Sequence, residues 1–337
     1  MQIFIETTGE SRTVDFGGVY DFNATDSYRD TGVVAISRIV REIREGKPWK
    51  QAVFDEFGVG SWISDIITSD ARHRFYTESL SLCDQRVLDI GSGWGQIAAP
   101  LTKKNDLFCV DLSLDKLVFT QLISRVEGDS SRFCGIAADI GKIHFQEKFD
   151  TIILNGVLEW IPKFTFSSKT VPEAQYDLLR RAKQQLKPGG RIVIGIENRI
   201  GLKYLLGVPD DHIGRPNLLN LDWETVVKIS EDQNVEPPRV RTMTMNEYED
   251  LLKKVGFLPI EFYCAFPDYK IPERVISVND SEGLTNFALN ETVPNERSGY
   301  DGASIDINRE LKSHYRTFAR MGVLKYFSPS YYIVAFA

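Results

Sequence analysis

Cysteine, excess positive charge and long apolar runs are all scarce in this chain of 337 residues. The four cysteines, Cys83, Cys109, Cys134 and Cys264, are far apart, without a CxxC pair or the spacing of a zinc site, so we expect buried, reduced thiols. The chain has 40 Lys and Arg against 47 Asp and Glu, a net charge of -7. This balance disfavours phosphate backbones and anionic membranes, and we expect no nucleic-acid partner.

The sequence also has no apolar stretch long enough to span a bilayer. Its first residues lack the basic and apolar segments of a secretory leader. We therefore expect a cytoplasmic protein without membrane insertion.

Histidine is scarce as well, with four in the chain. Three of them stand alone in the sequence and are expected to be structural or surface residues: His73, His144 and His314. The acids Asp210, Asp211 and Asp268 are candidate ligands for a hard cation, but they form no close-spaced loop of oxygen ligands. We predict no required metal.

Residues 1–82 are expected to form an extension that is mainly helical. Ile3 and Ile5 alternate as in a short strand, apolar residues recur at helical spacing over residues 33–43, and Gly46 provides a stop. Two roles remain open for this extension: a cap over a ligand site, or a segment that only stabilises the core.

From residue 86 onward, short apolar runs alternate with helical patterns. The runs RVLDI, LFCVDL, FCGIAADI, FDTIILNG and RIVIGIE have the composition of buried strands, and helical stretches such as 114–126 and 173–186 separate them. Buried strands that alternate with helices predict a parallel sheet covered on both faces, with right-handed crossovers. We therefore predict a doubly wound α/β domain over residues 83–337.

Two insertions interrupt this regular pattern, at about residues 198–244 and 267–329. The first follows the fifth strand and is rich in Gly, Pro and charge. The second separates the last two predicted strands, FLPIEFYCAF and SYYIVAFA. Because loops at strand ends often carry specificity, we expect both insertions on the substrate side.

Glycines follow the first strand of the domain immediately, in the segment VLDIGSGWG. Their spacing is D-x-G-x-G-x-G, from Asp89 through Gly91 and Gly93 to Gly95. Glycine lets the backbone pass close to a ligand, and amides at a helix start can face a polar group. A nicotinamide-dinucleotide fingerprint needs a further glycine where this chain has Gln96, so the spacing argues against that cofactor.

The same spacing resembles the first motif of the class I S-adenosylmethionine-dependent methyltransferases. The resemblance implies that S-adenosylmethionine (SAM) binds at successive strand ends and leaves as S-adenosylhomocysteine (SAH). It implies that Asp111 accepts bonds from the ribose hydroxyls, that Asp139 faces the adenine, and that Asn155 and Gly156 line the methionine end. The cofactor residues implied are Asp89, Gly91, Ser92, Gly93, Gly95, Asp111, Leu112, Asp139, Ile140, Asn155 and Gly156.

This resemblance covers residues 86–196 well. It implies a seven-stranded, mostly parallel sheet whose last strand inserts antiparallel beside its predecessor. The chain departs from the pattern at Trp160, where many relatives have a histidine, and at the two insertions.

Two further stretches, IENRIGLKY with DDHIG and FPDYK, resemble bacterial methyltransferases associated with glycosyltransferases in surface-polysaccharide assembly. That resemblance implies a sugar or glycan-end acceptor, methylated on a hydroxyl or a phosphate before export. It also implies association with a glycosyltransferase, and a homodimer is the alternative assembly.

Methyl transfer is an in-line displacement, so the enzyme aligns the nucleophile and supplies a base where the nucleophile is a hydroxyl. His212 is the first candidate base, because a histidine titrates near neutrality and Asp210 and Asp211 stand beside it. A surface histidine is the alternative interpretation. Glu197 is the second candidate base, and an ion pair with Arg199 is its alternative.

Acceptor contacts are expected from the same stretches. Cationic side chains there suit a phosphate or carboxylate, and tyrosines suit a sugar face, while solvated charges and core tyrosines are the alternatives. The predicted acceptor residues are Arg199, Lys203, Tyr204, Asp211 and Tyr269, with Arg215 and Lys270 as further anion-binding candidates.

Three other functions compete with a sugar O-methyltransferase. The first is methylation of a small molecule or natural product, and the second is a non-catalytic SAM-binding subunit. The third is an NAD-dependent enzyme on the same architecture. Gln96 argues against NAD, and the intact Asp89, Asp111 and glycines argue against a decayed site.

Overall fold

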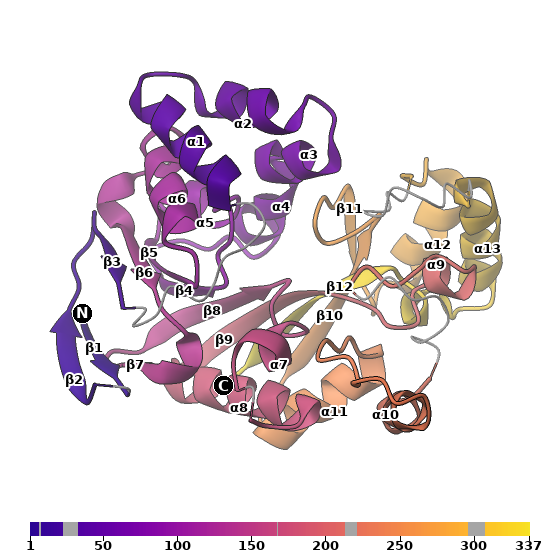
Figure 1. Cartoon of the computed structure of the whole chain (residues 1–337). Coiled ribbons are helices and arrows are strands. Elements are labelled where there is room, and N and C mark those ends of the chain that lie inside the picture. Colours follow the sequence, from indigo (N-terminus) through magenta and orange to yellow (C-terminus); the bar gives the residue numbers. More distant parts are fainter. Residues whose placement is uncertain (7, 23–32, 167, 213–220, 296–306) are drawn as a thin grey trace. The chain divides into compact units, whose positions relative to one another are not determined.

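The computed structural model describes residues 1–6, 8–22, 33–166, 168–212, 221–295 and 307–337 (Figure 1). The chain divides into two compact units. Unit 1 comprises Met1–Asn155, Arg181–Val193 and Ala337, and unit 2 comprises Gly156–Arg180 and Ile194–Phe336.

Unit 1 contains eight strands that lie wholly within it: β1 (Gln2–Ile5), β2 (Glu10–Thr13), β3 (Val19–Asp21), β4 (Arg86–Ile90), β5 (Asp106–Asp111), β6 (Phe133–Ala137), β7 (Ile143–Phe145) and β8 (Phe149–Asn155). Its helices are α1 (Val33–Arg44), α2 (Trp49–Phe57), α3 (Trp62–Thr68), α4 (Ala71–Arg74), α5 (Ala98–Leu101) and α6 (Leu114–Glu127). Shorter turns are η1 (Phe75–Ser79), η2 (Ser130–Arg132) and η3 (Ile140–Lys142). Helix α8 (Val171–Gln185) and strand β9 (Leu186–Glu197) have residues in both units.

Unit 2 contains strands β10 (Ile260–Phe266), β11 (Arg274–Ser277) and β12 (Ser330–Phe336). Its helices are α7 (Ile161–Phe164), α9 (Leu202–Leu205), α10 (Trp223–Asp232), α11 (Met245–Val255), α12 (Ser281–Asn290) and α13 (Asn308–Arg320), with the turn η4 (Leu324–Tyr326).

The strands of unit 1 lie in the order β8-β4-β5-β6-β3, and these neighbours pair in parallel. Strands β4 and β6 are buried along most of their length, as near-continuous apolar runs are in parallel sheets. Because parallel strands end at the same edge, the segments after β4, β5, β6 and β8 meet there. The predicted cofactor residues of unit 1 follow these strand ends.

The helices of the N-terminal extension pack against α6 within unit 1 (Figure 1). A buried apolar cluster joins the two parts: Ile36, Ile39, Val40, Ala52, Val53, Ile67, Ala99, Phe119, Leu122 and Ile123. The apolar faces of α1 and α6 are therefore buried against each other, which stabilises both helices.

The extension also supplies three strands. Strand β1 pairs antiparallel with β2 and with β7 in a small separate sheet, whereas β3 pairs in parallel with β6. The N-terminal 82 residues thus contribute to two sheets in addition to their helices.

In unit 2, β10 pairs antiparallel with β12 and with β11, in the order β11-β10-β12-β9. Helix α11 has both of the termini that its sequence indicates. Thr244 and Glu247 form a capping box at its start, and Gly256 ends it in the left-handed conformation, with φ of 96°.

The protein has an α/β fold with a mainly parallel central sheet, but the predicted count of seven strands was wrong. The sheet has nine strands among the described residues, because β3 and β11 occupy its two edges. The helix that follows the glycine loop, α5, begins at Ala98 and is only four residues long.

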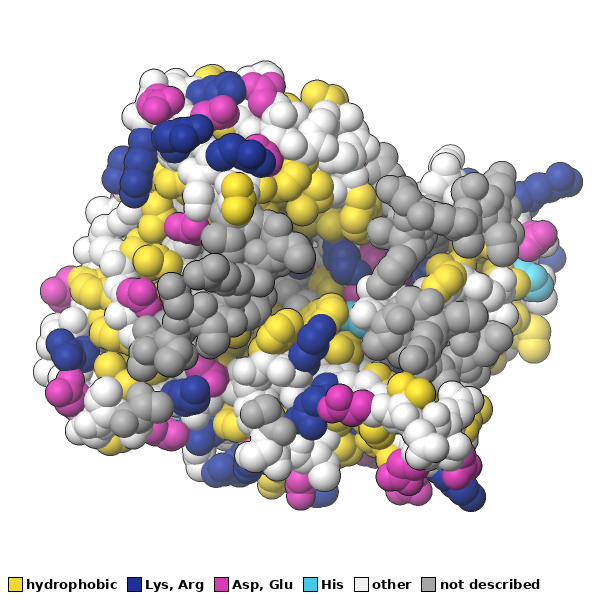
Figure 2. Space-filling model, in the orientation of Figure 1, with side chains coloured by type: hydrophobic (Ala, Val, Ile, Leu, Met, Phe, Trp, Pro, Cys, Tyr) yellow, Lys and Arg dark blue, Asp and Glu magenta, His cyan; other side chains and the backbone are white. Residues whose placement is uncertain are grey.

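Three of the cysteines, Cys109, Cys134 and Cys264, are buried, whereas Cys83 is exposed, and all four are free thiols. Within the described part of the chain, no helix combines the length and apolar character that crossing a membrane requires. Figure 2 shows Lys and Arg side chains beside Asp and Glu over α1 and α2, where the pairs Arg38–Glu56 and Lys47–Glu42 lie.

Candidate functional site

The glycine loop after β4 requires glycine for two reasons. Gly93 and Gly95 have φ of 54° and 72°, in the left-handed region that side chains disfavour. A Cβ on Gly95 would also overlap the hydroxyl of Thr120 on α6. The loop therefore presents bare backbone at the end of β4.

Asp111 closes the gap between this loop and the end of β5. Its carboxylate accepts bonds from the amide of Gly93 at 2.9 Å and from the amide of Ser113 at 2.8 Å. Ser113 in turn caps α6 through the amide of Lys116. Each carboxylate oxygen keeps further acceptor capacity, as a bound ribose diol requires.

Asp89 and Asn155 lie buried at neighbouring strand ends. Burial raises the pKa of Asp89 to about 8, with Arg72 acting against it and Asp111 in the same direction. The amide nitrogen of Asn155 donates to the hydroxyl of Tyr76 at 3.0 Å, and its oxygen accepts two bonds from Arg72 at 2.9 Å. Residues of the N-terminal extension thus hold the side chain predicted to line the methionine end.

The remaining predicted cofactor residues of unit 1 lie around the same edge. Asp139 accepts a bond from the amide of Gly141 at 2.9 Å and caps η3, which is the strand-end role that an acid can have without a ligand. Ser92 is buried, and the apolar Leu112 and Ile140 are half-buried. Bare glycine backbone, a carboxylate and half-buried apolar side chains at one edge fit an adenosine-type group such as SAM.

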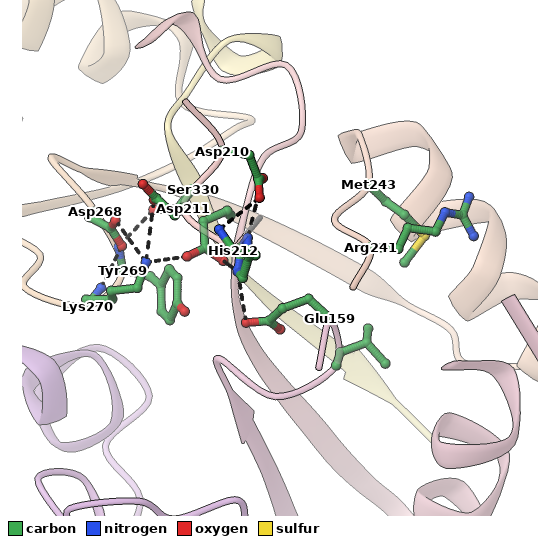
Figure 3. A network of polar contacts seen from close by, with 12 residues as sticks. Glu159, Asp210, Asp211, His212, Arg241, Met243, Asp268, Tyr269, Lys270 and Ser330 are labelled. Carbon is green, nitrogen blue, oxygen red and sulfur yellow. Dashed lines mark hydrogen bonds and ion pairs between the residues drawn. The ribbon is translucent and has the colours of Figure 1, made fainter. Parts of the chain in front are cut away.

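Unit 2 contains a buried polar cluster around His212 (Figure 3). The Nε2 atom of His212 lies 3.6 Å from Glu197 and 3.7 Å from Glu159, and its Nδ1 atom lies 3.5 Å from Asp210. The side chain of His212 is only 5% exposed, and the ring of Trp160 packs edge-on against it at 5.2 Å. The two predicted catalytic residues, His212 and Glu197, are therefore neighbours.

Glu159 is a member of this cluster that the sequence analysis missed. It stands between β8 and α7, is fully buried, and neither of its carboxylate oxygens has a hydrogen-bond partner among the described residues. The signal in the sequence was an acid four residues after the end of a buried strand. It was overlooked because the departure from the family pattern at the neighbouring Trp160 was considered instead.

Lysines occupy the other side of the cluster. Lys270 pairs with Glu197 and lies 3.4 Å from Asp268, while Lys203 lies 3.0 Å from Asp211. Asp211 also accepts a bond from the hydroxyl of Tyr204 at 3.1 Å. Lys203 and Tyr204, predicted as acceptor contacts, are thus buried and bonded to Asp211.

The ionisation of the cluster follows from these contacts. Burial alone would lower the pKa of His212, but Glu197 and Asp210 raise it well above its usual value. Burial alone would raise the pKa of Glu197, but Lys270 and His212 hold it well below its usual range. For Glu159, burial prevails and raises the pKa.

Gly156 and Tyr269 lie against each other. A Cβ on Gly156 would stand 2.7 Å from the hydroxyl oxygen of Tyr269, and Gly156 has φ of 73°. Tyr269 is buried, and its amide donates to the hydroxyl of Ser330 at 2.8 Å. The glycine after β8 therefore makes room for a tyrosine that was predicted to contact the acceptor.

A cavity opens beside the cluster within unit 2. His212 and Asp210 line it, together with Arg199, Trp223 and Arg241. Further lining comes from Leu221, Val226, Pro238, Val240 and Thr242.

The two arginines of the cavity share one carboxylate. Arg199 binds Glu247 at 2.9 Å, and Arg241 lies 3.5 Å from the same side chain. The ion pair between Glu197 and Arg199 that the sequence left open does not form; Glu197 pairs with Lys270 instead. Arg215, a further anion-binding candidate, lies outside the described residues.

The structure thus divides the predicted site residues between the units. All predicted cofactor residues except Gly156 belong to unit 1, and all predicted catalytic and acceptor residues belong to unit 2.

Residues 68–210 of the chain match the model of the family described as methyltransferase small domain. None of the curated proteins compared with the chain matches it. The family match indicates a methyltransferase domain over residues 68–210, which are less than half of the chain.

Similar solved structures include other methyltransferases at low identity. A SAM-dependent methyltransferase of Thermotoga maritima, possibly acting on histamine according to its name, is 16% identical, with a TM-score of 0.41, over 84% of this chain and 98% of its own. A putative O-methyltransferase of Nostoc punctiforme is 16% identical, with a TM-score of 0.43, over 73% of this chain and 71% of its own.

The CcbJ methyltransferase of Streptomyces caelestis is 19% identical, with a TM-score of 0.34, over 40% of this chain. The match spans 55% of the length of that relative. At these TM-scores the similar structures do not indicate the acceptor of this chain.

Proposed function

We propose that the protein transfers a methyl group from SAM to a hydroxyl of a sugar, a glycan end or a sugar phosphate, in cytoplasmic surface-polysaccharide assembly. SAM supplies an electrophilic methyl group on a sulfonium. The bond between the methyl carbon and sulfur breaks, a bond to the acceptor oxygen forms, and the hydroxyl proton passes to the protein.

One observation carries this proposal: the cavity of unit 2 is lined by His212 and Asp210 at one part and by an aromatic ring and two arginines at another. A group that can handle a proton and a surface that can hold a polar ring thus share one cavity. A site of this kind suits a hydroxylated acceptor better than an apolar one.

The charges in the cavity favour an acceptor with an anionic group. Arg199 and Arg241 face a single carboxylate, Glu247, so the trio carries one excess positive charge. Trp223 lies beneath the guanidinium of Arg241 at 5.9 Å and offers a face on which a sugar ring can stack. A sugar phosphate or a uronic acid would satisfy both.

We assign His212 and Glu197 as the catalytic pair, in which the ionised Glu197 accepts the hydroxyl proton and His212, its ion-pair partner, holds it in place, with Glu159 as their neighbour. Of the predicted acceptor residues, Arg199 has a place on the cavity wall. The other predicted acceptor residues are positioning residues in this proposal, because their contacts are with other side chains of unit 2: Lys203, Tyr204, Asp211 and Tyr269.

The cofactor assignments are part of the same proposal. Asp111 binds the ribose, Asp139 with Leu112 and Ile140 surrounds the adenine, and Asn155 with Gly156 lines the methionine end. Asp89, Ser92 and the glycines shape the loop. Residues 1–82 extend a methyltransferase domain of residues 83–337, and the insertions at 198–244 and 267–329 choose the acceptor. A glycosyltransferase or a second copy of the chain is the proposed partner.

The test is methyl transfer to a panel of nucleotide sugars, uronic acids and sugar phosphates, with phenols and amines as the competing acceptors. The proposal expects SAH release and a gain of one methyl group in a sugar, and His212→Ala should lower turnover by about 100-fold or more while SAM binding persists. Transfer only to phenols or amines would favour the small-molecule function. Unchanged turnover in His212→Ala would remove this histidine from the mechanism.

A further inference from the structure

Three atoms of the cluster in unit 2 converge at ion-pair distances that are longer than a hydrogen bond. They are Oε1 of Glu159, Oε2 of Glu197 and Nε2 of His212, and all lie within 4.8 Å of one another. Figure 3 shows Glu159 and His212 pointing toward each other across this space. Both oxygens of Glu159 and Oε2 of Glu197 are buried without a hydrogen-bond partner among the described residues. Unpartnered buried carboxylate oxygens are costly, so this arrangement calls for a ligand.

The distances fit a shared ion better than hydrogen bonds. The Nε2 atom lies 3.6 Å and 3.7 Å from the two carboxylates, beyond the range of about 2.7–3.2 Å for a hydrogen bond. Two ligand atoms at about 2.1 Å from a tetrahedral ion stand roughly 3.4 Å apart. The two distances from Nε2 to the carboxylates lie within a few tenths of an ångström of that separation.

The surroundings of His212 also resemble those of a metal ligand. Asp210 lies 3.5 Å from Nδ1 and binds the amide of His212 at 2.8 Å. With Asp210 on the Nδ1 side, Nε2 is the ring nitrogen that faces Glu159 and Glu197. Trp160 fixes the plane of the ring from the side.

The charge balance points the same way. Five carboxylates belong to the cluster: Glu159, Glu197, Asp210, Asp211 and Asp268. Against them stand two lysines, Lys203 and Lys270, and His212. The acidic side chains of the cluster thus outnumber its basic side chains by five to three among the described residues, and a bound cation would reduce this imbalance.

We propose that Glu159, Glu197 and His212 bind a divalent transition-metal ion of the Zn²⁺ or Mn²⁺ type. One imidazole and two carboxylates are a donor set for these ions, whereas Mg²⁺ and Ca²⁺ prefer oxygen alone. Three protein ligands leave at least one position open, and the adjoining cavity, which His212 lines, gives access to it. This inference replaces the expectation that the protein needs no metal.

The metal site deepens the proposed function and rests on it for its chemical role. A bound ion lowers the pKa of a hydroxyl that coordinates it, so an acceptor oxygen would be activated without a strong base. His212 then holds the ion and does not take up the proton, which passes to a carboxylate of the cluster or to solvent.

The test uses the full-length protein, stripped of metal by chelation and saturated with SAM. Calorimetric titration with Zn²⁺ and with Mn²⁺ should show one equivalent bound, confirmed by elemental analysis after gel filtration. Glu159→Gln, which keeps the shape and removes the charge, should weaken binding at least 10-fold. The control Glu231→Gln, at an exposed acid on α10, should leave binding unchanged.

A second variant, His212→Gln, guards against misfolding of the first, and thermal unfolding verifies each protein. The metal site would be overturned if neither Zn²⁺ nor Mn²⁺ bound the wild type. It would also be overturned if the folded variants Glu159→Gln and His212→Gln bound the ion as tightly as the wild type does. Methyl transfer to sugars that persists after chelation would also overturn it while leaving the proposed function intact. Metal binding without transfer to any sugar would retain the site and reject the acceptor.

Discussion

A single buried carboxyl, Asp89, links the glycine motif of unit 1 to the pH dependence of stability. Burial raises its pKa to about 8, although Arg72 opposes this shift. In the unfolded chain the same group titrates near pH 4. The stabilising contribution is therefore complete below about pH 4 and is lost as the pH rises to about 8, because the unfolded state ionises first.

Asp89→Asn should remove this pH dependence, because an amide stays neutral at every pH. The stability of the variant relative to the wild type should increase by roughly 3–4 kcal/mol between pH 5 and pH 8, at about 1.4 kcal/mol per pH unit. Chemical denaturation across this range measures it, with Asp70→Asn, at an exposed acid, as the control. A difference that stays constant with pH would show that Asp89 is ionised in the folded protein.

The sequence predicted some individual site residues better than others. His212 and Glu197 were found because a histidine beside two acids and an acid at a strand end are visible locally, and the structure brings them within 3.6 Å. Glu159 was missed because its significance depends on burial and on partners far away in the chain. Neither of these is encoded in the residues next to it.

Among the structural elements, the segment formed by α4 and η1 connects the N-terminal extension to a strand end. Tyr76 and Arg72 from this segment bond to Asn155 after β8. Through these bonds the extension holds the side chain of Asn155 in place.

Tyr76→Phe should lower the free energy of unfolding by about 1 kcal/mol, the typical value of one hydrogen bond. It should also weaken SAM binding several-fold, because the amide of Asn155 loses one of its two anchors. Calorimetry and thermal unfolding measure both effects. Tyr20→Phe removes a hydroxyl that binds only near Asp15 and is the matched control. Unchanged SAM affinity in Tyr76→Phe would separate the extension from the cofactor site.

Elements with a strong local pattern were predicted closely. Helix α6 spans Leu114–Glu127 where residues 114–126 were expected, because its apolar residues recur to that point and Ser113 caps its start. The edge strands β3 and β11 were not predicted, because three or four residues are too few to show a period of two. Their places in the sheet come from pairing with β6 and β10, which is not visible locally.

At the scale of the whole molecule, the two units carry different parts of the proposed chemistry. Unit 1 holds the glycine loop and Asp111, and unit 2 holds the cluster around His212 with its cavity. Variants at the glycine loop or Asp111 in unit 1 should therefore change the affinity for SAM. Variants in the His212 cluster of unit 2 should change turnover, with little overlap between the two effects.

Calorimetric titration of the purified protein with SAM, SAH and NAD tests the central claim, that this is a SAM-dependent methyltransferase, most directly. We expect that SAM and SAH bind, that NAD does not, and that Asp111→Ala weakens SAM binding by about 10- to 100-fold, through loss of charge-assisted bonds of about 1.5–3 kcal/mol. Thermal unfolding confirms that the variant is folded. Binding of NAD in place of SAM, or full SAM affinity in Asp111→Ala, would contradict the account.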